Sequence, residues 1–208
     1  MICFEKIEQF HISEPTAITI GKFDGLHRGH EELIRRLLDK RKQGLKAVAF
    51  TFDIPPKKLT DGDYLQLLST NEEKQALFAE RGMDYLLRCP FTPQVMSMEP
   101  EKFVEWIVRE LNVKSIVVGE DCGFGHKRRG DCRLLAQLAP EYGYELEVVK
   151  KIQFDGRDIS STYIREEILK GNMETAAMLL GHPYSIDGTV ETGNQIGRTI
   201  GIPTANIE

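Results

Sequence analysis

The sequence is poor in cysteine, has a single tryptophan and carries no long apolar run. Its cysteines are scattered without a C-x-x-C pair, so we expect free thiols rather than a zinc site or a disulfide framework. No apolar stretch approaches the length that crosses a bilayer, and the first residues lack the basic start and apolar run of a secretory signal. We therefore expect a cytoplasmic protein with no membrane partner. The four cysteines are Cys3, Cys89, Cys122 and Cys132.

The sequence also has little excess of either charge. Its formal net charge of −5 at pH 7 removes the broad attraction to phosphate backbones that nucleic-acid binders show. The basic run Lys127–Arg129 is the stretch that most favours a nucleic-acid partner, and we interpret it as a solvated loop tip. Any phosphate that this chain binds must therefore be held by a local site.

The composition is that of a folded globular protein. Apolar residues make up 41% of the chain and charged residues 28%, without the low hydrophobicity and high net charge of disordered chains. A length of 208 residues allows one domain with a sizeable core and part of a second. The sequence carries no signal of an oligomeric state.

Short apolar runs alternate with longer amphipathic ones, and this alternation predicts an α/β fold with a parallel sheet. Ligands of such sheets usually bind at the carboxyl ends of the strands. Strands are predicted at residues 17–20, 45–52, 83–87, 115–118 and 144–149. Helices are predicted at residues 31–42, 71–81, 101–111, 132–142, 162–170 and 173–180.

The pattern changes after Gly181. The segment 183–192 alternates polar and apolar residues, and glycines then interrupt a stretch rich in β-forming residues. We place a domain boundary there, with one domain at residues 1–181 and the start of another at residues 182–208.

The strongest chemical signal is the segment Gly21–His30, which begins where the first apolar strand ends and continues into the first helix. A helix N-terminus at that point offers unpaired N–H groups and a favourable dipole to a phosphate. His27 and His30 are three residues apart, so both project from one face of the first turn and can donate hydrogen bonds to the same triphosphate. Gly29 leaves room between them, which would let a nucleotide lie against the backbone.

A second group of donors precedes a later helix. Ser160, Ser161 and Thr162 can cap that helix while offering hydroxyl groups to an anion. Arg165 returns to the same face three residues after Thr162, and its planar guanidinium can bind two phosphate oxygens at once. Together with the first motif, this predicts a second wall of a phosphate site.

These motifs also carry a family resemblance. The pattern G-x-F-D-G-x-H-x-G-H resembles the ATP-binding signature of bacterial bifunctional FAD synthetases, which join an N-terminal FMN adenylyltransferase to a C-terminal riboflavin kinase. The resemblance extends along nearly the whole chain, in the right order. It includes residues 51–53, 118–125, 159–165 and 180–184, and residues 197–206 resemble the opening of the kinase domain.

The resemblance implies a Rossmann-like nucleotidyltransferase domain followed by the first strands of an incomplete β-barrel. It implies transfer of the adenylyl group of ATP to FMN, giving FAD and pyrophosphate, with Mg²⁺ bound to the nucleotide. Riboflavin kinase activity would need a complete C-terminal domain, which by this interpretation the chain as given lacks.

The implied site residues fall into four groups. His27, His30 and Arg165 would be catalytic. Residues near ATP would be Gly21, Lys22, Phe23, Asp24, Gly25, Gly29, Asp121, Ser160, Ser161 and Thr162. The flavin would be bound by Phe52, Asp53, Pro56 and Phe124. Thr204 and Asn206 would hold Mg²⁺ in a complete kinase domain.

The sequence departs from the family pattern at four positions. The family usually has Pro-His-Pro where this chain has Ile54, Pro55 and Pro56, an aromatic residue at the position of Cys122, and often Asn at the position of Lys22. Two alternatives therefore stay open. The chain could transfer a nucleotide to another phosphorylated acceptor, or it could bind flavin or nucleotide without turnover.

Overall fold

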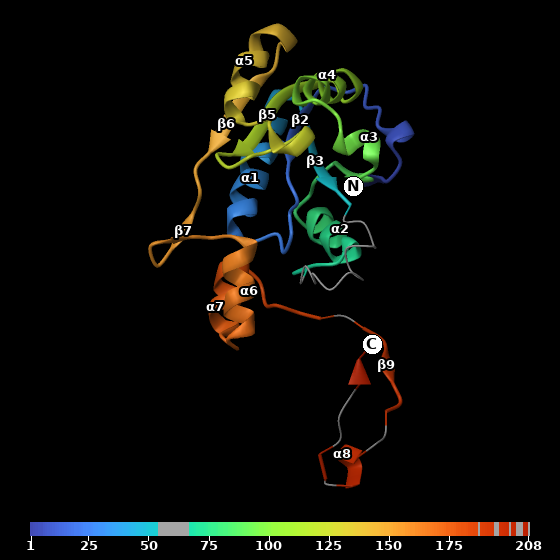
Figure 1. Ribbon diagram of the computed structural model, residues 1–208, viewed down its shortest axis with the longest axis vertical. Coiled ribbons are helices and arrows are strands. Elements are labelled where there is room, and N and C mark those ends of the chain that lie inside the picture. The colour runs from blue at the N-terminus through green and yellow to red at the C-terminus, as the bar shows by residue number, and fades with distance from the viewer. Residues whose placement is uncertain (54–66, 187, 194–195, 200, 203–205, 208) are drawn as a thin grey trace.

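The computed structural model describes residues 1–53, 67–186, 188–193, 196–199, 201–202 and 206–207. Within them, a six-stranded parallel sheet has the order β1-β4-β3-β2-β5-β6 (Figure 1). The predicted α/β class and parallel sheet are confirmed. The strands are β1 (Ile2–Phe4), β2 (Thr16–Ile20), β3 (Lys46–Phe52), β4 (Tyr85–Cys89), β5 (Val113–Gly119) and β6 (Glu145–Val149).

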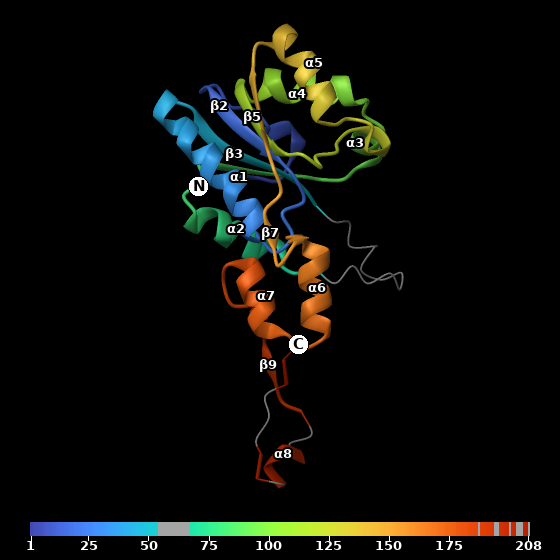
Figure 2. The same cartoon turned by 90° about the vertical axis from the view of Figure 1, so that its left-hand side faces the viewer.

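Helices cover both faces of this sheet, and alternate residues of each strand serve one face or the other. On one face, Ala47, Ala49 and Leu86 pack with α1 (Arg28–Asp39) and α2 (Asn71–Glu80). On the other face, larger side chains such as Phe50 pack with α4 (Pro100–Glu110) and α5 (Cys132–Tyr142). Figure 2 shows α1 and the pair α4 and α5 on opposite sides of the strands. Two cores result, and the sheet lies between them.

A third cluster of buried residues joins the end of the sheet to a helical pair. The hairpin of β7 (Gln153–Phe154) and β8 (Arg157–Asp158) leads into α6 (Ser161–Leu169) and α7 (Met173–Leu180), which pack on each other. Leu68, Ile164 and Leu180 are among the buried residues there. This pair lies below the carboxyl ends of the strands in Figure 1, where it can close one side of a site.

The described part of the C-terminal segment projects away from the helices and the sheet in both views (Figures 1 and 2). β9 (Val190–Glu191) pairs antiparallel with β10 (Asn206–Ile207), and a short helix, α8 (Ile196–Thr199), lies between them. Ile186, Val190 and Ile202 are each more than 60% exposed. The domain boundary after residue 181 stays a prediction.

Most predicted elements are present, with shifted ends. The first helix begins at Arg28, three residues before its predicted start, because His27 takes the N-cap position; it ends at Asp39 and continues as a 3-10 turn, η2 (Lys40–Gln43). The edge strand β1 was not predicted, because three residues carry no period-2 signal. Other short elements are η1 (Ile7–Gln9), α3 (Pro93–Met96) and η4 (His126–Arg128). No helix in the described ranges is long and apolar enough to cross a membrane.

Candidate active site at the carboxyl ends of the strands

The turn between β2 and α1 carries the backbone across the carboxyl end of the sheet. The Gly21 amide donates a hydrogen bond of 3.0 Å to the Phe50 carbonyl on β3, so the start of the turn is held against the neighbouring strand. Phe23, Gly25 and Leu26 then adopt positive φ angles of 49°, 83° and 38°. The curled backbone brings His27 to the N-cap of α1, where the sequence predicted a phosphate-binding turn.

The two histidines of this turn stack on each other. Their ring centroids are 3.7 Å apart and their planes differ by 18°. The Nδ1 atoms of His27 and His30 are buried, and neither has a hydrogen-bond partner within the described ranges. The prediction that both rings project from one face is confirmed. Two stacked imidazoles at a helix N-terminus are suited to meet an anion.

Both imidazoles are neutral at pH 7. Burial lowers the pKa of His27 from 6.5 to about 4, and the nearby Asp121 carboxylate opposes this change. Burial also lowers the pKa of His30 well below 6.5, with smaller effects in the same direction from the charges of His27 and Lys74. A neutral imidazole has one N–H and one acceptor nitrogen. Each ring can therefore donate one hydrogen bond to a phosphate oxygen.

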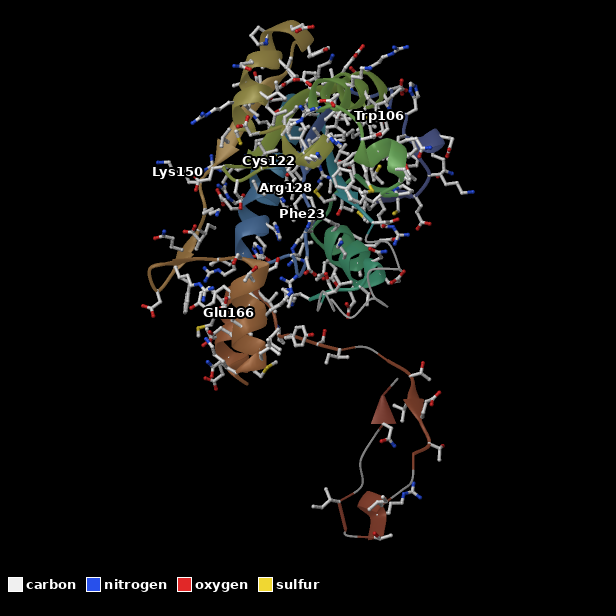
Figure 3. The ribbon with its side chains drawn as sticks, viewed as in Figure 1. Phe23, Trp106, Cys122, Arg128, Lys150 and Glu166 are labelled. Atoms are coloured by element: carbon white, nitrogen blue, oxygen red, sulfur yellow. The ribbon has the colours of Figure 1, made fainter. Side chains whose placement is uncertain are left out.

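Two residues of the turn shape the histidine pair. A Cβ on Gly29 would lie 3.1 Å from Nδ1 of His27, so glycine here makes room for the His27 ring, and the predicted approach of a nucleotide to this backbone stays a prediction. The Phe23 ring is buried and meets His30 edge-on, with centroids 5.1 Å apart. Figure 3 shows Phe23 near the centre of the molecule. Its side chain supports His30 from inside the core and is not open to ATP.

Asp24 ties three segments together. Its Oδ1 accepts hydrogen bonds from the amides of Leu68 at 2.8 Å and Ser69 at 3.3 Å, and its Oδ2 accepts one from Arg165. Its carbonyl accepts a hydrogen bond of 2.9 Å from the Ser161 hydroxyl. The carboxylate is buried. Asp24 thus holds the phosphate turn against α6 and against the start of α2.

The second predicted wall is the start of α6. Ser160 caps this helix by accepting a hydrogen bond of 3.2 Å from the Tyr163 amide, as predicted. Ser161 and Thr162 form the first turn, and Arg165 follows on the side that faces Asp24. The structure therefore brings together the two motifs, although His30 and Ser160 are 130 positions apart in the sequence.

The remaining predicted residues lie around the strand ends. Asp121 follows β5, is exposed, and places Oδ2 3.3 Å from the Lys151 ammonium. The Phe124 ring is buried against Phe103, with centroids 5.6 Å apart, and its predicted contact with the flavin stays a prediction. Figure 3 shows Cys122 and Arg128 in the same region of the view. Burial raises the pKa of Cys122 to about 12, so its thiol stays protonated at neutral pH.

The predicted flavin residues at the end of β3 are only partly open. Phe52 is half-buried and meets the exposed ring of Phe91 edge-on at 5.5 Å. Asp53 has a buried Oδ1 atom without a hydrogen-bond partner among the described residues. Lys22 is exposed, and its carbonyl accepts a hydrogen bond from Thr51. Ile54, Pro55, Pro56 and Thr204 lie outside the described residues, and Asn206 lies in β10.

The sequence analysis missed the contribution of α2. Lys74 and Phe78 are the buried residues of this helix, and they are four positions apart. Such spacing puts both on one helical face, and this is the signal in the sequence that could have identified Lys74, although lysine is mostly exposed in proteins. Ser69, just before the helix, accepts a hydrogen bond of 3.1 Å from the Gly25 amide. Thr70 caps α2 in a reciprocal capping box with Glu73.

Comparison with known proteins identifies the family. The family model described as FAD synthetase matches residues 9–163, which include the histidine turn and the start of α6. The chain belongs to the FAD synthetase family. The model described as riboflavin kinase matches residues 180–208.

Relatives of this FAD synthetase family member are similar over most of its length. The chain is 38% identical over 197 residues to the bifunctional riboflavin kinase/FMN adenylyltransferase of Escherichia coli K12 and covers 63% of it. It is 37% identical over 193 residues to the protein of that name from Listeria monocytogenes and covers 61% of it. These matches take in 93% and 91% of the present chain. The chain therefore spans a little under two thirds of these relatives.

Solved structures support the fold. A Streptococcus pneumoniae protein, described as a macrolide-efflux protein, is 31% identical and superposes with a TM-score of 0.88 over the whole of this chain and 69% of its own. Pantothenate synthetase from Thermus thermophilus is 17% identical and has a TM-score of 0.54 over 87% of this chain and 81% of its own. The second similarity concerns the fold alone.

Mg²⁺ has no cage of protein ligands in the part of the chain that the structure describes. No group of three or more His, Cys, Asp or Glu side chains is placed there to hold a metal ion. The described residues do not form a dedicated metal site.

Proposed function

We propose that this chain transfers the adenylyl group of ATP to FMN. A phosphate oxygen of FMN attacks the α-phosphorus of ATP, the bond from that phosphorus to the bridging oxygen of the β-phosphate breaks, and pyrophosphate leaves as FAD forms. The identities of 38% and 37% to bifunctional riboflavin kinase/FMN adenylyltransferases support this acceptor. The histidine turn at the N-terminus of α1, joined through Asp24 to the start of α6, supports the use of a nucleotide.

The observation that carries the proposal is the stacked pair His27 and His30 at the N-terminus of α1, with two buried nitrogens that lack a partner among the described residues. Neutral donors at a helix N-terminus favour negative charge as it develops on a phosphate. No side chain has to become covalently attached, because positioning and charge stabilisation supply most of the catalysis in such transfers.

The start of α6 forms the facing wall in this proposal. The Ser161 hydroxyl and the Arg165 guanidinium both reach Asp24 of the phosphate turn, so they lie beside the histidine pair. A guanidinium holds five N–H donors in one plane and can bind a carboxylate and a phosphate oxygen together. We place the triphosphate between these two walls.

Two further parts of the proposal concern the metal ion and the location in the cell. We propose that Mg²⁺ arrives with the nucleotide, because phosphate oxygens are ligands that it prefers. We also propose a cytoplasmic location, which the four free cysteines support.

A product assay tests the proposal. Purified protein is incubated with ATP, Mg²⁺ and FMN, and FAD and pyrophosphate are measured; other phosphorylated acceptors are run in parallel. We expect FAD and pyrophosphate in equal amounts. Pyrophosphate release with a different acceptor but not with FMN would reassign the substrate, and binding without pyrophosphate release would indicate a module without turnover.

Variants connect this activity to the histidine pair. His27→Ala and His30→Ala should each lower kcat by on the order of 10²-fold while weakening ATP binding less, since their donors act on charge that grows during the reaction. His11→Ala is the matched control, because His11 is exposed and pairs with Glu110 before β2, at the opposite end of the strand. Near-normal kcat in either active-site variant would remove the histidines from the mechanism.

A further inference from the structure

Lys74 is a buried lysine without a hydrogen-bonding partner in the described part of the chain. It is 3% exposed, and its ammonium makes no hydrogen bond or ion pair to another described residue. A buried charge in this condition is costly, and lysines are almost never fully buried unless they are paired. Binding of an anionic ligand would offset this cost, because the ligand would pair with the buried ammonium.

The position of Lys74 on α2 places it beside the histidine pair. Lys74 lies four residues before Phe78, on the same face of the helix. Phe78 packs edge-on against Phe23 at 5.3 Å, and Phe23 packs against His30 at 5.1 Å. Because helical side chains lean toward the N-terminus, Lys74 extends from this aromatic contact toward the strand ends.

Charged neighbours confirm this placement. Burial lowers the pKa of Lys74, while the carboxylates of Asp24 and Asp53 raise it and Arg88 lowers it further. Its own charge in turn disfavours protonation of His30. Arg88 is occupied elsewhere, since it pairs with Glu5. Lys74 is therefore close enough to His30, Asp24 and Asp53 for its charge to act on all three.

We propose that the Lys74 ammonium binds the phosphate of the acceptor, FMN, and holds it next to His30 for attack on ATP. This inference rests on the proposed function and assigns a residue to the acceptor half of the site. Lys74 is a substrate-binding residue here and does not transfer a proton.

The geometry favours the acceptor phosphate over the triphosphate. In-line transfer needs the attacking oxygen on the side of the α-phosphorus opposite the leaving pyrophosphate. The α6 wall, with Ser161 and Arg165, lies on one side of the phosphate turn. Lys74 comes to the histidine pair from α2, a different element, and its charge also acts on Asp53, which follows β3. If Lys74 binds the FMN phosphate, the flavin ring of the same molecule can lie at the end of β3.

Binding of two flavins that differ only in the phosphate tests this assignment. FMN and riboflavin are titrated into wild-type protein and Lys74→Met in the presence of a non-hydrolysable ATP analogue, and flavin fluorescence is followed. Methionine has a similar length without the charge. We expect Kd for FMN to rise by on the order of ten- to a hundredfold, the scale of a lost charge-assisted hydrogen bond, and Kd for riboflavin to stay within about twofold.

A surface lysine and a stability measurement serve as controls. Lys42→Met removes an exposed lysine that pairs with Asp39 at the far end of α1, and it should leave both flavin affinities unchanged. The melting temperature of Lys74→Met should equal or exceed that of the wild type, because the variant loses an unpaired buried charge. A clear fall in melting temperature with equal loss of FMN and riboflavin affinity would show a structural role and overturn the proposal.

Two other outcomes would also overturn it. Unchanged FMN affinity in Lys74→Met would remove Lys74 from the acceptor site, and weaker binding of the ATP analogue with normal FMN binding would move Lys74 to the triphosphate. Failure of the proposed function is separate, since it appears as absence of FAD with the wild-type protein and all substrates present.

Discussion

Desolvation determines the protonation of the histidine pair. His27 lies against Gly29 and stacks on His30, and the two rings leave water little access to either. The charged forms are therefore disfavoured, and the pair meets a phosphate as two neutral donors. This has a consequence for stability, because an unfolded chain leaves both rings free to take up protons near pH 6.5.

We expect the fold to lose stability in acid through His27. Its pKa falls from 6.5 in the unfolded chain to about 4 in the folded one, so the unfolded state binds more protons between these values. Well above pH 6.5, His27 leaves the free energy of unfolding unchanged. As the pH drops from 6.5 toward 4, this free energy falls, and below pH 4 the total loss from His27 is about 3 kcal/mol. Urea unfolding at pH 7.5 and pH 4.5 measures this.

The comparison of variants isolates the contribution of His27. His27→Gln cannot take up this proton and should lose less stability between the two pH values than the wild type, whereas His11→Gln, at an exposed position, should follow the wild type. The same acid loss in His27→Gln as in the wild type would contradict the assignment. His30 acts in the same direction, so the variant should flatten the pH dependence only in part.

Arg165 combines a structural contact with a predicted catalytic one. Because its guanidinium pairs with the buried carboxylate of Asp24, its charge and its shape both matter. We expect Arg165→Lys to lower kcat/KM nearly as much as Arg165→Ala, since an ammonium cannot hold the carboxylate and a phosphate with the same fork. Steady-state kinetics at varied ATP, with melting temperatures for both variants, test this. Full activity in Arg165→Lys would show that charge alone is sufficient.

At the scale of elements, the site depends on how the turn after β2 is anchored. Asp24 and Gly25 bind residues 68 and 69, just before α2, and Ser161 and Arg165 bind the turn from α6. The phosphate turn, the start of α2 and the start of α6 are distant in sequence, and hydrogen bonds to Asp24 and Gly25 hold them together. Any change that moves Gly25 should disturb all three.

We expect Gly25→Ala to be strongly destabilising. Gly25 has φ +83°, and an added Cβ would lie 2.9 Å from Leu68 and 3.2 Å from Leu180. Gly44 is the matched control, because its φ is +80° and nothing lies within 4 Å of an added Cβ. Gly44→Ala should cost about 1 kcal/mol from backbone strain, and Gly25→Ala roughly 2–4 kcal/mol because overpacking adds to it. Equal losses in urea unfolding would show that packing at Gly25 is unimportant.

At the scale of the whole molecule, the chain has one well-packed body and a C-terminal segment of different character. The described residues of that segment form a single two-stranded pair, β9 and β10, together with α8. Their apolar side chains, including Val190, Ile196 and Ile202, are largely exposed. Two isolated strands do not bury enough surface for independent stability.

The 208-residue polypeptide should therefore make FAD from FMN but should not make FMN from riboflavin. A kinase site in a small barrel needs closed strands around it, and the described part of this segment supplies one pair. Incubation with riboflavin, ATP and Mg²⁺, followed by chromatography of the flavins, tests the expectation. Appearance of FMN would contradict it, and FAD formed only when FMN is supplied would support it.

The sequence by itself determined the α/β class, the parallel sheet and most of its elements, because these follow from local periodicity and from glycine and capping signals. It also determined the phosphate turn and the capped helix at Ser160, since both motifs are contiguous. The roles assigned to the predicted site residues stay predictions that the experiments above address.

Only the tertiary structure decided which distant residues meet. The packing of α2 brought Lys74 to His30, the bonds of Asp24 joined α6 to the phosphate turn, and the core took in Phe124. The same fold placed the His27 ring against Gly29, where an added Cβ would lie 3.1 Å from Nδ1 of His27. Such contacts join segments that are far apart in the chain. The periodicity of a sequence predicts local helices and strands, but it does not show which distant residues meet or which become buried.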